Sequence, residues 1–184
     1  MNIFVLDLNP SRAARYHMSV HTVKMILETA QMLSTAHRLI DGHLYTEKTK
    51  SNRSIKRWAL PDSREQVLYK ATHVNHPCSV WARENDRNYL WLFSLFLALC
   101  DEYTYRTGKT HKTDRELSSL LSDLPHNIPK AAQMTPFAQA MPDEFKDNDP
   151  VVAYRKYYQF KADTISRVSW SNRSVPHFIS LPGE

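Results

Sequence analysis

The sequence predicts a mainly α-helical protein that forms a single compact domain, with a short extended segment at its N-terminus and long irregular loops. A chain of 184 residues can bury a hydrophobic core without disulfides or metals. It has three glycines and ten prolines, which suits helices with proline-bounded loops better than a sandwich or barrel with many tight turns. Long stretches also show helical periodicity of their apolar residues.

The N-terminal part of the chain is predicted to be a buried extended segment followed by a helix. Residues 2–7 are the extended segment. Asn9 and Pro10 match an N-cap and the first position of a helix. The helical pattern continues until Gly42 ends it, and Ser19 could cap a second helix and so divide the run.

Residues 46–57 are predicted to form a basic, mobile loop. They contain five basic residues and one acidic residue, with Ile55 as their only large apolar residue. Two interpretations remain open. The segment is either a solvated linker or an arm that contacts phosphates, while Trp58 stacks on a base or on the protein.

The middle of the chain is predicted to contain the core helix. Residues 62–72 are predicted to form a helix that precedes it. Residues 86–106 leave almost no polar face, so they should form the central helix, with Gly108 as its C-cap. Thr113 and Glu116 form a capping-box pattern for a short helix that ends near residue 124.

A proline-rich connection is predicted to lead to the last helix. Residues 125–149 should cross the surface as an irregular segment. Asp149 and Pro150 repeat the N-cap pattern and start a helix that reaches about residue 166. Three large apolar side chains in the tail are available to dock on the core. They are Trp170, Phe178 and Ile179.

Composition excludes several classes of protein. The formal net charge is +5 and the pI is about 9.2, which favours a polyanionic partner. Cys78 and Cys100 occur without a CxxC motif, so we expect buried thiols in a reducing compartment. The sequence shows no signal peptide and no membrane segment. It has no Walker loop, GxGxxG or GxSxG motif, and its three glycines leave no glycine-rich phosphate loop.

A narrow polar stripe on the long N-terminal helix is the best candidate for a catalytic site. At 100° per residue the stripe falls on one side of the helix while apolar residues cover most of the rest. Its catalytic candidates are His17, His21, Lys24 and Glu28, followed by Gln31 and Thr35. Two histidines can serve as acid and base near neutral pH, and a carboxylate beside a lysine can orient or activate water. The alternative is a satisfied polar network that packs against another helix.

A metal is not predicted at this stripe. Histidines four residues apart could ligate zinc only with a third ligand, for which His73, His76, Cys78 and Glu28 are the candidates. The HxxxH pattern lacks the glutamate that follows the first histidine in zincins. We therefore predict neither a metal nor another cofactor.

Ten further residues are predicted to contact phosphate or nucleic acid. They belong to the basic loop, to a cluster at the end of the core helix, and to the last helix and tail, where aromatic and basic residues alternate. They are Arg53, Lys56, Arg57, Trp58, Arg106, Lys109, His111, Lys112, Tyr157 and Arg173. For the second group, stabilisation of a helix C-terminus is the competing role, and for the third it is a core-docking aromatic face.

Four motifs carry a resemblance to a family of small, uncharacterised proteins of tailed phages. They are HxxxHTVKMILExxQ from His17, NYxWL from Asn88, EYxxRxGKxHK from Glu102 and MPDE from Met141. Together they extend over nearly the whole chain. The resemblance implies a phage protein located in the host-cell cytoplasm, but it does not imply a reaction.

A fainter similarity is to the phage-type pyrimidine-dimer DNA glycosylases. These are small, basic, helical proteins with a histidine on the first helix and a Tyr-Tyr pair near the C-terminus. They use a free N-terminal amine and a glutamate of the first helix. This chain starts Met1-Asn2, and Glu28 lies later than that glutamate, so the similarity implies DNA-base chemistry without assigning the nucleophile.

The sequence therefore predicts a phage enzyme that acts on a DNA base or a nucleotide. Its stripe would supply acid–base chemistry, or a lysine whose pKa burial lowers would attack as an amine. DNA or a nucleotide is the expected partner, a host protein is a further candidate, and no membrane is involved. The alternative is a non-catalytic phage protein that binds nucleic acid or a host protein.

Overall fold

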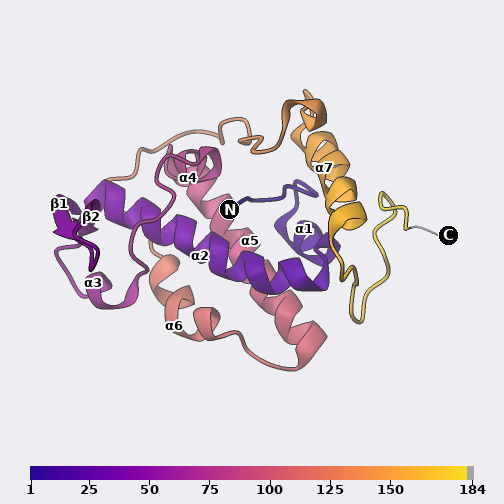
Figure 1. The fold of residues 1–184 in the computed structure, drawn as a ribbon, viewed down its shortest axis with the longest axis horizontal. Coiled ribbons are helices and arrows are strands. Elements are labelled where there is room, and N and C mark those ends of the chain that lie inside the picture. The colour runs from indigo at the N-terminus through magenta and orange to yellow at the C-terminus, as the bar shows by residue number, and fades with distance from the viewer. Residues whose placement is uncertain (182–184) are drawn as a thin grey trace.

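The computed structural model describes residues 1–181 and is mostly helical. Seven α-helices, one 3-10 turn and one two-stranded sheet form in these residues (Figure 1). The mainly α prediction is confirmed, and the small sheet is an addition to it. Within residues 1–181, no helix is both long and apolar enough to cross a bilayer.

Two long helices, α2 (Ser19–Asp41) and α5 (Asp86–Thr107), pack against each other at the centre. The predicted core helix is confirmed within one residue. Asn85 caps the start of α5 by accepting hydrogen bonds from the next turn, and Gly108, at φ 70°, ends it in the left-handed conformation.

Shorter helices surround this pair. α1 (Pro10–Tyr16) packs on α5, while α4 (Pro77–Ala82) and α6 (Lys112–Leu121) pack on α2. α7 (Pro150–Thr164) lies at the end of the molecule opposite the sheet (Figure 1). Both predicted Asn/Asp-Pro starts are confirmed, because Asn9 and Asp149 each accept a hydrogen bond from the first turn of the helix that follows.

The long N-terminal run is divided near Ser19, as the sequence suggested, but Ser19 is the first residue of the second helix and not its cap. α1 ends at Tyr16 and α2 starts at Ser19. Met18 is the N-cap residue, and its backbone N–H donates to the Tyr158 hydroxyl of α7 at 2.8 Å. This hydrogen bond at the break connects the start of α2 to α7.

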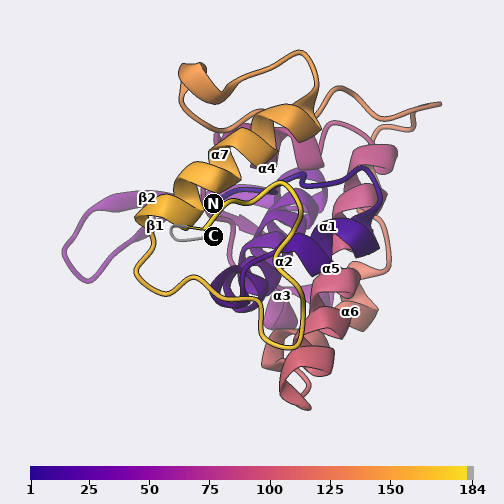
Figure 2. The same ribbon diagram turned by 90° about the vertical axis from the view of Figure 1, so that its right-hand side faces the viewer.

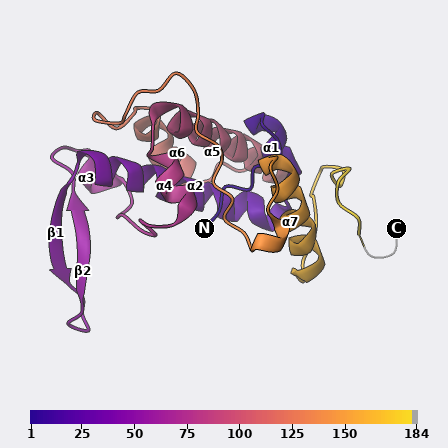
Figure 3. The same ribbon diagram turned by 90° about the horizontal axis from the view of Figure 1, so that it is seen from above.

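The prediction of a mobile loop at residues 46–57 is wrong. The chain forms an antiparallel hairpin of β1 (His43–Lys48) and β2 (Ser54–Ala59), in register from His43–Ala59 to Lys48–Ser54. Both strands contain residues that favour β-structure, Tyr45 and Thr46 in β1 and Ile55 and Trp58 in β2. Asn52 takes a positive φ of 60° at the turn, a conformation that asparagine tolerates. Figures 2 and 3 show the hairpin projecting from the body.

Arg38 of α2 ties the hairpin and the following loop to the helix. Its guanidinium is buried and donates to the carbonyl oxygens of Trp58, Glu65, Leu68 and Tyr69, and to the Glu65 carboxylate. The same contacts explain why the helix expected at 62–72 is limited to α3 (Arg64–Val67). Three of these carbonyl oxygens, at residues 65, 68 and 69, accept hydrogen bonds from Arg38. In a longer helix they would accept from backbone N–H groups four residues later.

Gly42 joins α2 directly to β1. A Cβ there would lie 2.4 Å from the Arg38 carbonyl oxygen and 3.0 Å from that of Ala59. Only glycine allows the two backbones to approach this closely. The hairpin thus leaves the helix without an intervening linker.

The remaining segments largely follow the sequence prediction. α6 begins at Lys112, and its N-cap is His111, whose ring accepts a hydrogen bond from the Thr113 N–H. The predicted capping box that starts at Thr113 is therefore wrong. Residues 125–149 are irregular apart from the turn Asp143–Phe145. Trp170 and Ile179 of the tail are buried, as are the free thiols of Cys78 and Cys100.

Candidate active site

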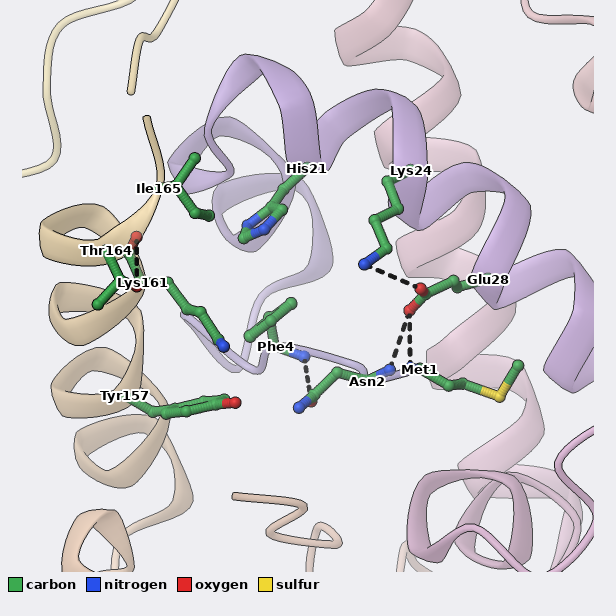
Figure 4. Close-up of a pocket in the computed structure, with 10 residues that line it drawn as sticks. All are labelled: Met1, Asn2, Phe4, His21, Lys24, Glu28, Tyr157, Lys161, Thr164 and Ile165. Atoms are coloured by element: carbon green, nitrogen blue, oxygen red, sulfur yellow. Dashed lines mark hydrogen bonds and ion pairs between the residues drawn. The ribbon is translucent and has the colours of Figure 1, made fainter. Parts of the chain in front are cut away.

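A cavity of about 350 Å³ opens between α2, α7 and the N-terminal segment. It contains three of the four predicted catalytic residues, and the predicted nucleic-acid contact Tyr157 lies on its α7 wall (Figure 4). The lining residues are Met1, Asn2, Phe4, His21, Lys24, Glu28, Tyr157, Lys161, Thr164 and Ile165. The part of the polar stripe formed by His21, Lys24 and Glu28 therefore faces a cavity. Thr35, further along α2, is instead buried and hydrogen-bonds the Thr72 backbone.

Glu28 lies between two amines. Its Oε1 is 3.4 Å from Lys24 Nζ, and its Oε2 is 3.6 Å from the α-amino nitrogen of Met1. The backbone N–H of Asn2 also donates to Oε2 at 3.1 Å. The Lys24 side chain is 62% exposed, so the burial predicted for this lysine is wrong. Glu28, at 13% exposed, is held in place by the N-terminal segment.

The N-terminal segment forms the floor of the cavity through a tight local turn. The Asn2 side-chain oxygen accepts the N–H groups of Ile3 and Phe4, and its amide donates to the Ala140 carbonyl. Phe4 has a positive φ of 33°, which is strained for a bulky residue. This conformation places the Phe4 ring in a stack on His21, with ring centroids 5.1 Å apart.

His21 is held in one tautomer. Its Nδ1 lies 2.8 Å from the Tyr158 hydroxyl, which already accepts the Met18 N–H. Tyr158 is fully buried, so its proton needs an acceptor, and His21 Nδ1 is the atom within reach. The proton of His21 is therefore on Nε2. Burial, together with the charge of nearby Lys24, lowers the pKa of His21 to about 4, so the ring is neutral at physiological pH.

α7 supplies the opposite wall of the cavity. Tyr157 stacks on Phe4 with ring centroids 6.1 Å apart, and Lys161 Nζ lies 4.8 Å from the centre of the Tyr157 ring. Sequence reasoning did not assign Lys161 or Tyr158 to the site. The signal for Lys161 was its spacing of four residues from Tyr157, which places both on one helical face.

His17 is separated from the other three residues of the stripe, so the prediction that it lines the same pocket is wrong. The helix break turns it inward, where it is completely buried and its Nδ1 donates to the Ala13 carbonyl at 2.7 Å. Its Nε2 is buried without a hydrogen-bond partner among residues 1–181. Burial lowers its pKa to about 3. His17 is thus a neutral core residue.

Part of the apolar surface of α2 is exposed to solvent. Val20, Val23 and Leu27 are each at least 40% exposed. They lie on the helix beside Lys24. An apolar row therefore borders the mouth of the cavity.

Arg106 and Arg173 are used by the fold and not left free for phosphate. Arg106 is buried, pairs with Glu102 at 2.6 Å and donates to the carbonyls of Arg15 and His17. Arg173 donates to both carboxylate oxygens of Glu102 at 2.9 Å and stacks on Tyr105. The prediction that Arg106 receives phosphate is wrong, because a buried ion pair occupies its guanidinium.

The other predicted phosphate contacts divide between two places. Lys109, His111 and Lys112 lie at the junction of α5 and α6, where His111 caps α6 and Lys112 pairs with Glu116 at 3.6 Å. Arg53, Lys56, Arg57 and Trp58 lie in or beside β2 of the hairpin. Neither group borders the cavity.

Residues 1–181 bring together no group of three His, Cys, Asp or Glu side chains able to hold a metal ion. The additional ligands considered from the sequence, His73, His76 and Cys78, do not line the cavity. The groups available for chemistry there are amines, one carboxylate and a neutral imidazole.

Comparisons of the chain with protein-family models, curated proteins and solved structures find no match. The resemblance to a phage family stays a prediction. Function must be argued from the geometry of the cavity.

Proposed function

We propose that this protein acts on a base in DNA and breaks the bond between the base and its deoxyribose with an amine nucleophile. The observation that carries the proposal is the position of Glu28, whose carboxylate faces two amines at a cavity with aromatic walls. A carboxylate in that position can accept the proton that an ammonium group must lose before it attacks.

The cavity also suits a nucleotide. Tyr157 is half-buried at the cavity wall and offers aromatic surface to a base, while the buried Phe4 ring packs between Tyr157 and His21. Lys161 and Lys24 supply positive charge for a phosphate. His21 presents an N–H from Nε2, so it would donate a hydrogen bond to a base oxygen. In this proposal His21 is therefore a hydrogen-bond donor and not the general base that the sequence predicted.

The proposed reaction balances without a cofactor. The amine, which is either Lys24 Nζ or Met1 N, transfers a proton to Glu28 and forms a bond to C1′ as the C1′–N bond to the base breaks. The departing base takes the bonding electron pair and the proton held by Glu28. The attacking nitrogen then gives a second proton to Glu28, and its lone pair forms the C=N bond as C1′–O4′ breaks. Glu28 passes that proton to O4′, which leaves an iminium ion. Water hydrolyses this ion to an aldehyde and returns the amine.

The experiment that tests this proposal is trapping with sodium borohydride. Hydride reduces an iminium ion to a stable secondary amine, so the protein should become covalently attached to a duplex that carries an abasic site. The same adduct should form on a duplex with a thymine dimer, where base release has to come first. Peptide mapping of the adduct then identifies Lys24 or Met1 as the nucleophile.

Absence of an adduct on either duplex, with binding to DNA retained, would contradict the proposal. That result would favour the alternative function, a non-catalytic nucleic-acid-binding protein. An adduct that maps to an exposed lysine far from the cavity would also contradict it, because such a lysine could react without Glu28.

A further inference from the structure

We propose that the β1–β2 hairpin is a ribbon that binds a groove of duplex DNA about one helical turn from the base held in the cavity. The inference rests on the proposed function and narrows its substrate to double-stranded DNA. Three observations carry it: the charge of the hairpin, the division of that charge between its two faces, and its position relative to the cavity.

Most of the protein's excess positive charge lies in the hairpin. Residues 43–59 contain five basic residues and one acidic residue, and the resulting +4 is most of the chain's formal +5. Lys48, Lys50, Arg53 and Lys56 are exposed. None of these four takes part in an ion pair within residues 1–181. A projecting, unpaired cluster of this kind favours a polyanion.

Strand register separates the two faces of the ribbon. Thr46 pairs with Lys56 and Lys48 pairs with Ser54, so these side chains share one face. The only acidic residue, Glu47, points to the other face, where it pairs with Arg57 at 2.9 Å. One face therefore presents cations and hydroxyl groups without a carboxylate. Arg57, which the sequence predicted to contact phosphate, lies on the same face as Glu47 and pairs with it. In this proposal Lys48 and Lys50 contact phosphate in its place.

The ribbon and the cavity lie on the same side of the molecule. Figure 3 shows the hairpin projecting on the α2 side, away from α5 and α6, and in Figure 4 α5 lies behind α2, away from the cavity. Lys24 and Gly42 are at opposite ends of α2, about 27 Å apart at 1.5 Å per residue. That distance corresponds to about 8 base pairs of B-DNA at 3.4 Å each, slightly less than one turn.

The geometry favours duplex DNA over other polyanions. A two-stranded β-ribbon fits the major groove of B-DNA, whereas the major groove of A-form RNA is too narrow to admit one. A single strand would be recognised by aromatic side chains between the cations. The aromatic side chain on the cationic face, Trp58, lies at the base of the hairpin, where Arg38 binds its carbonyl. The unpaired cations next to the turn, Lys50 and Arg53, have no aromatic residue between them.

The test compares two double variants on two lengths of DNA. Lys50→Ser/Lys56→Ser removes two hairpin charges, and Arg87→Ser/Arg115→Ser, on α5 and α6, removes two exposed charges elsewhere as a matched control. The probe is a duplex with a central tetrahydrofuran abasic analogue, which has no C1′ leaving group, so that binding is measured without chemistry. The long duplex has 12 base pairs on each side of the analogue and the short one has 5.

On the long duplex, the hairpin variant should bind at least tenfold more weakly than the wild type at 0.15 M salt. The slope of log affinity against log salt should be shallower by about 2, one for each lost phosphate contact. On the short duplex, which ends before the ribbon, hairpin variant and wild type should bind alike. The control variant should follow the wild type on both.

Equal loss on the short and long duplexes, or no loss on either, would overturn the inference, as would a duplex RNA that binds as tightly as the long DNA. Failure of the proposed chemistry would be seen separately. In that case no borohydride adduct forms, although the length-dependent effect of the hairpin variant persists.

Discussion

The two ends of α2 each hold a buried histidine hydrogen-bonded to a tyrosine hydroxyl, but only one of these pairs is closed. Near the hairpin, His37 Nε2 lies 2.8 Å from the Tyr89 hydroxyl, and its Nδ1 lies 2.9 Å from Arg64 Nη1. Both ring nitrogens are therefore engaged. At the other end, His21 has one nitrogen on Tyr158 and belongs to the lining of the cavity.

The surrounding charges differ in the same way. Arg64 beside His37 pairs with Asp41 at 2.6 Å and with Asp62 at 2.7 Å. Glu28, near His21, pairs with Lys24, whose side chain is 62% exposed. The same residue types thus stabilise the fold where every polar atom has a partner, and form a site where some remain free for a ligand.

The largest expected effect is loss of activity at the open end. Glu28→Gln keeps the shape of the side chain but removes the proton acceptor, so the rate of adduct formation should fall by about 10²- to 10⁴-fold. Glu116→Gln is the matched control, because Glu116 also pairs with a lysine one helical turn away but lies at α6. Single-turnover trapping measures both rates. A Glu28→Gln rate within threefold of the wild type would rule out its role as base.

The closed end should respond in stability instead. Arg64→Ala leaves the Asp41 carboxylate, whose side chain is 3% exposed, without its cation. Unfolding free energy should fall by about 3–5 kcal/mol, as measured by urea denaturation. Lys24→Ala, which breaks an exposed pair at the open end, should change it by less than about 1 kcal/mol. Similar losses for the two variants would refute the distinction.

Removing the tyrosine hydroxyls should separate the two functions of the histidine–tyrosine pairs. Tyr89→Phe and Tyr158→Phe should each lower the unfolding free energy by about 1–3 kcal/mol, because a buried partner loses its hydrogen bond. Only Tyr158→Phe should also lower the trapping rate, since His21 then carries its proton on Nε2 in only part of the molecules. An unchanged rate would mean that the tautomer of His21 has no role.

In one respect the two ends should behave alike. Burial lowers the pKa of both His21 and His37 to about 4, from an ordinary value of 6.5. Between pH 6.5 and 4 the unfolded chain therefore binds more protons than the folded one, so stability falls as the pH falls. His21→Gln and His37→Gln should each reduce this dependence by up to about 1.4 kcal/mol per pH unit. Denaturation at pH 7, 6 and 5 measures it, and unchanged slopes would contradict the buried, neutral histidines.

Sequence patterns predicted the elements that local physics controls. The core helix at 86–106 and the Asn-Pro and Asp-Pro helix starts follow from periodicity and capping, which depend on neighbouring residues only. The hairpin was missed because charge and polarity were given more weight than the β-favouring residues Tyr45, Ile55 and Trp58. The helix at 62–72 was overestimated because it is limited by Arg38, which lies far away in the sequence.

The site was predictable to a similar extent. Helical periodicity brought His21, Lys24 and Glu28 together, and the structure places all three at one cavity. It could not show that the break before Ser19 turns His17 into the core. The other walls of the cavity, from Phe4 and α7, depend on long-range packing that no spacing in the sequence records.

Gly42 has a consequence for how the protein would follow its substrate. α2 continues into β1 without a linker, and Arg38 fixes the base of the hairpin. The helix therefore keeps the cavity and the hairpin at a constant distance from each other. In the proposed complex a single extra nucleotide between the two contacts would rotate one of them by about 34° around the DNA axis, at 10.5 base pairs per turn. The protein would then sense the helical phase of the DNA as well as the base.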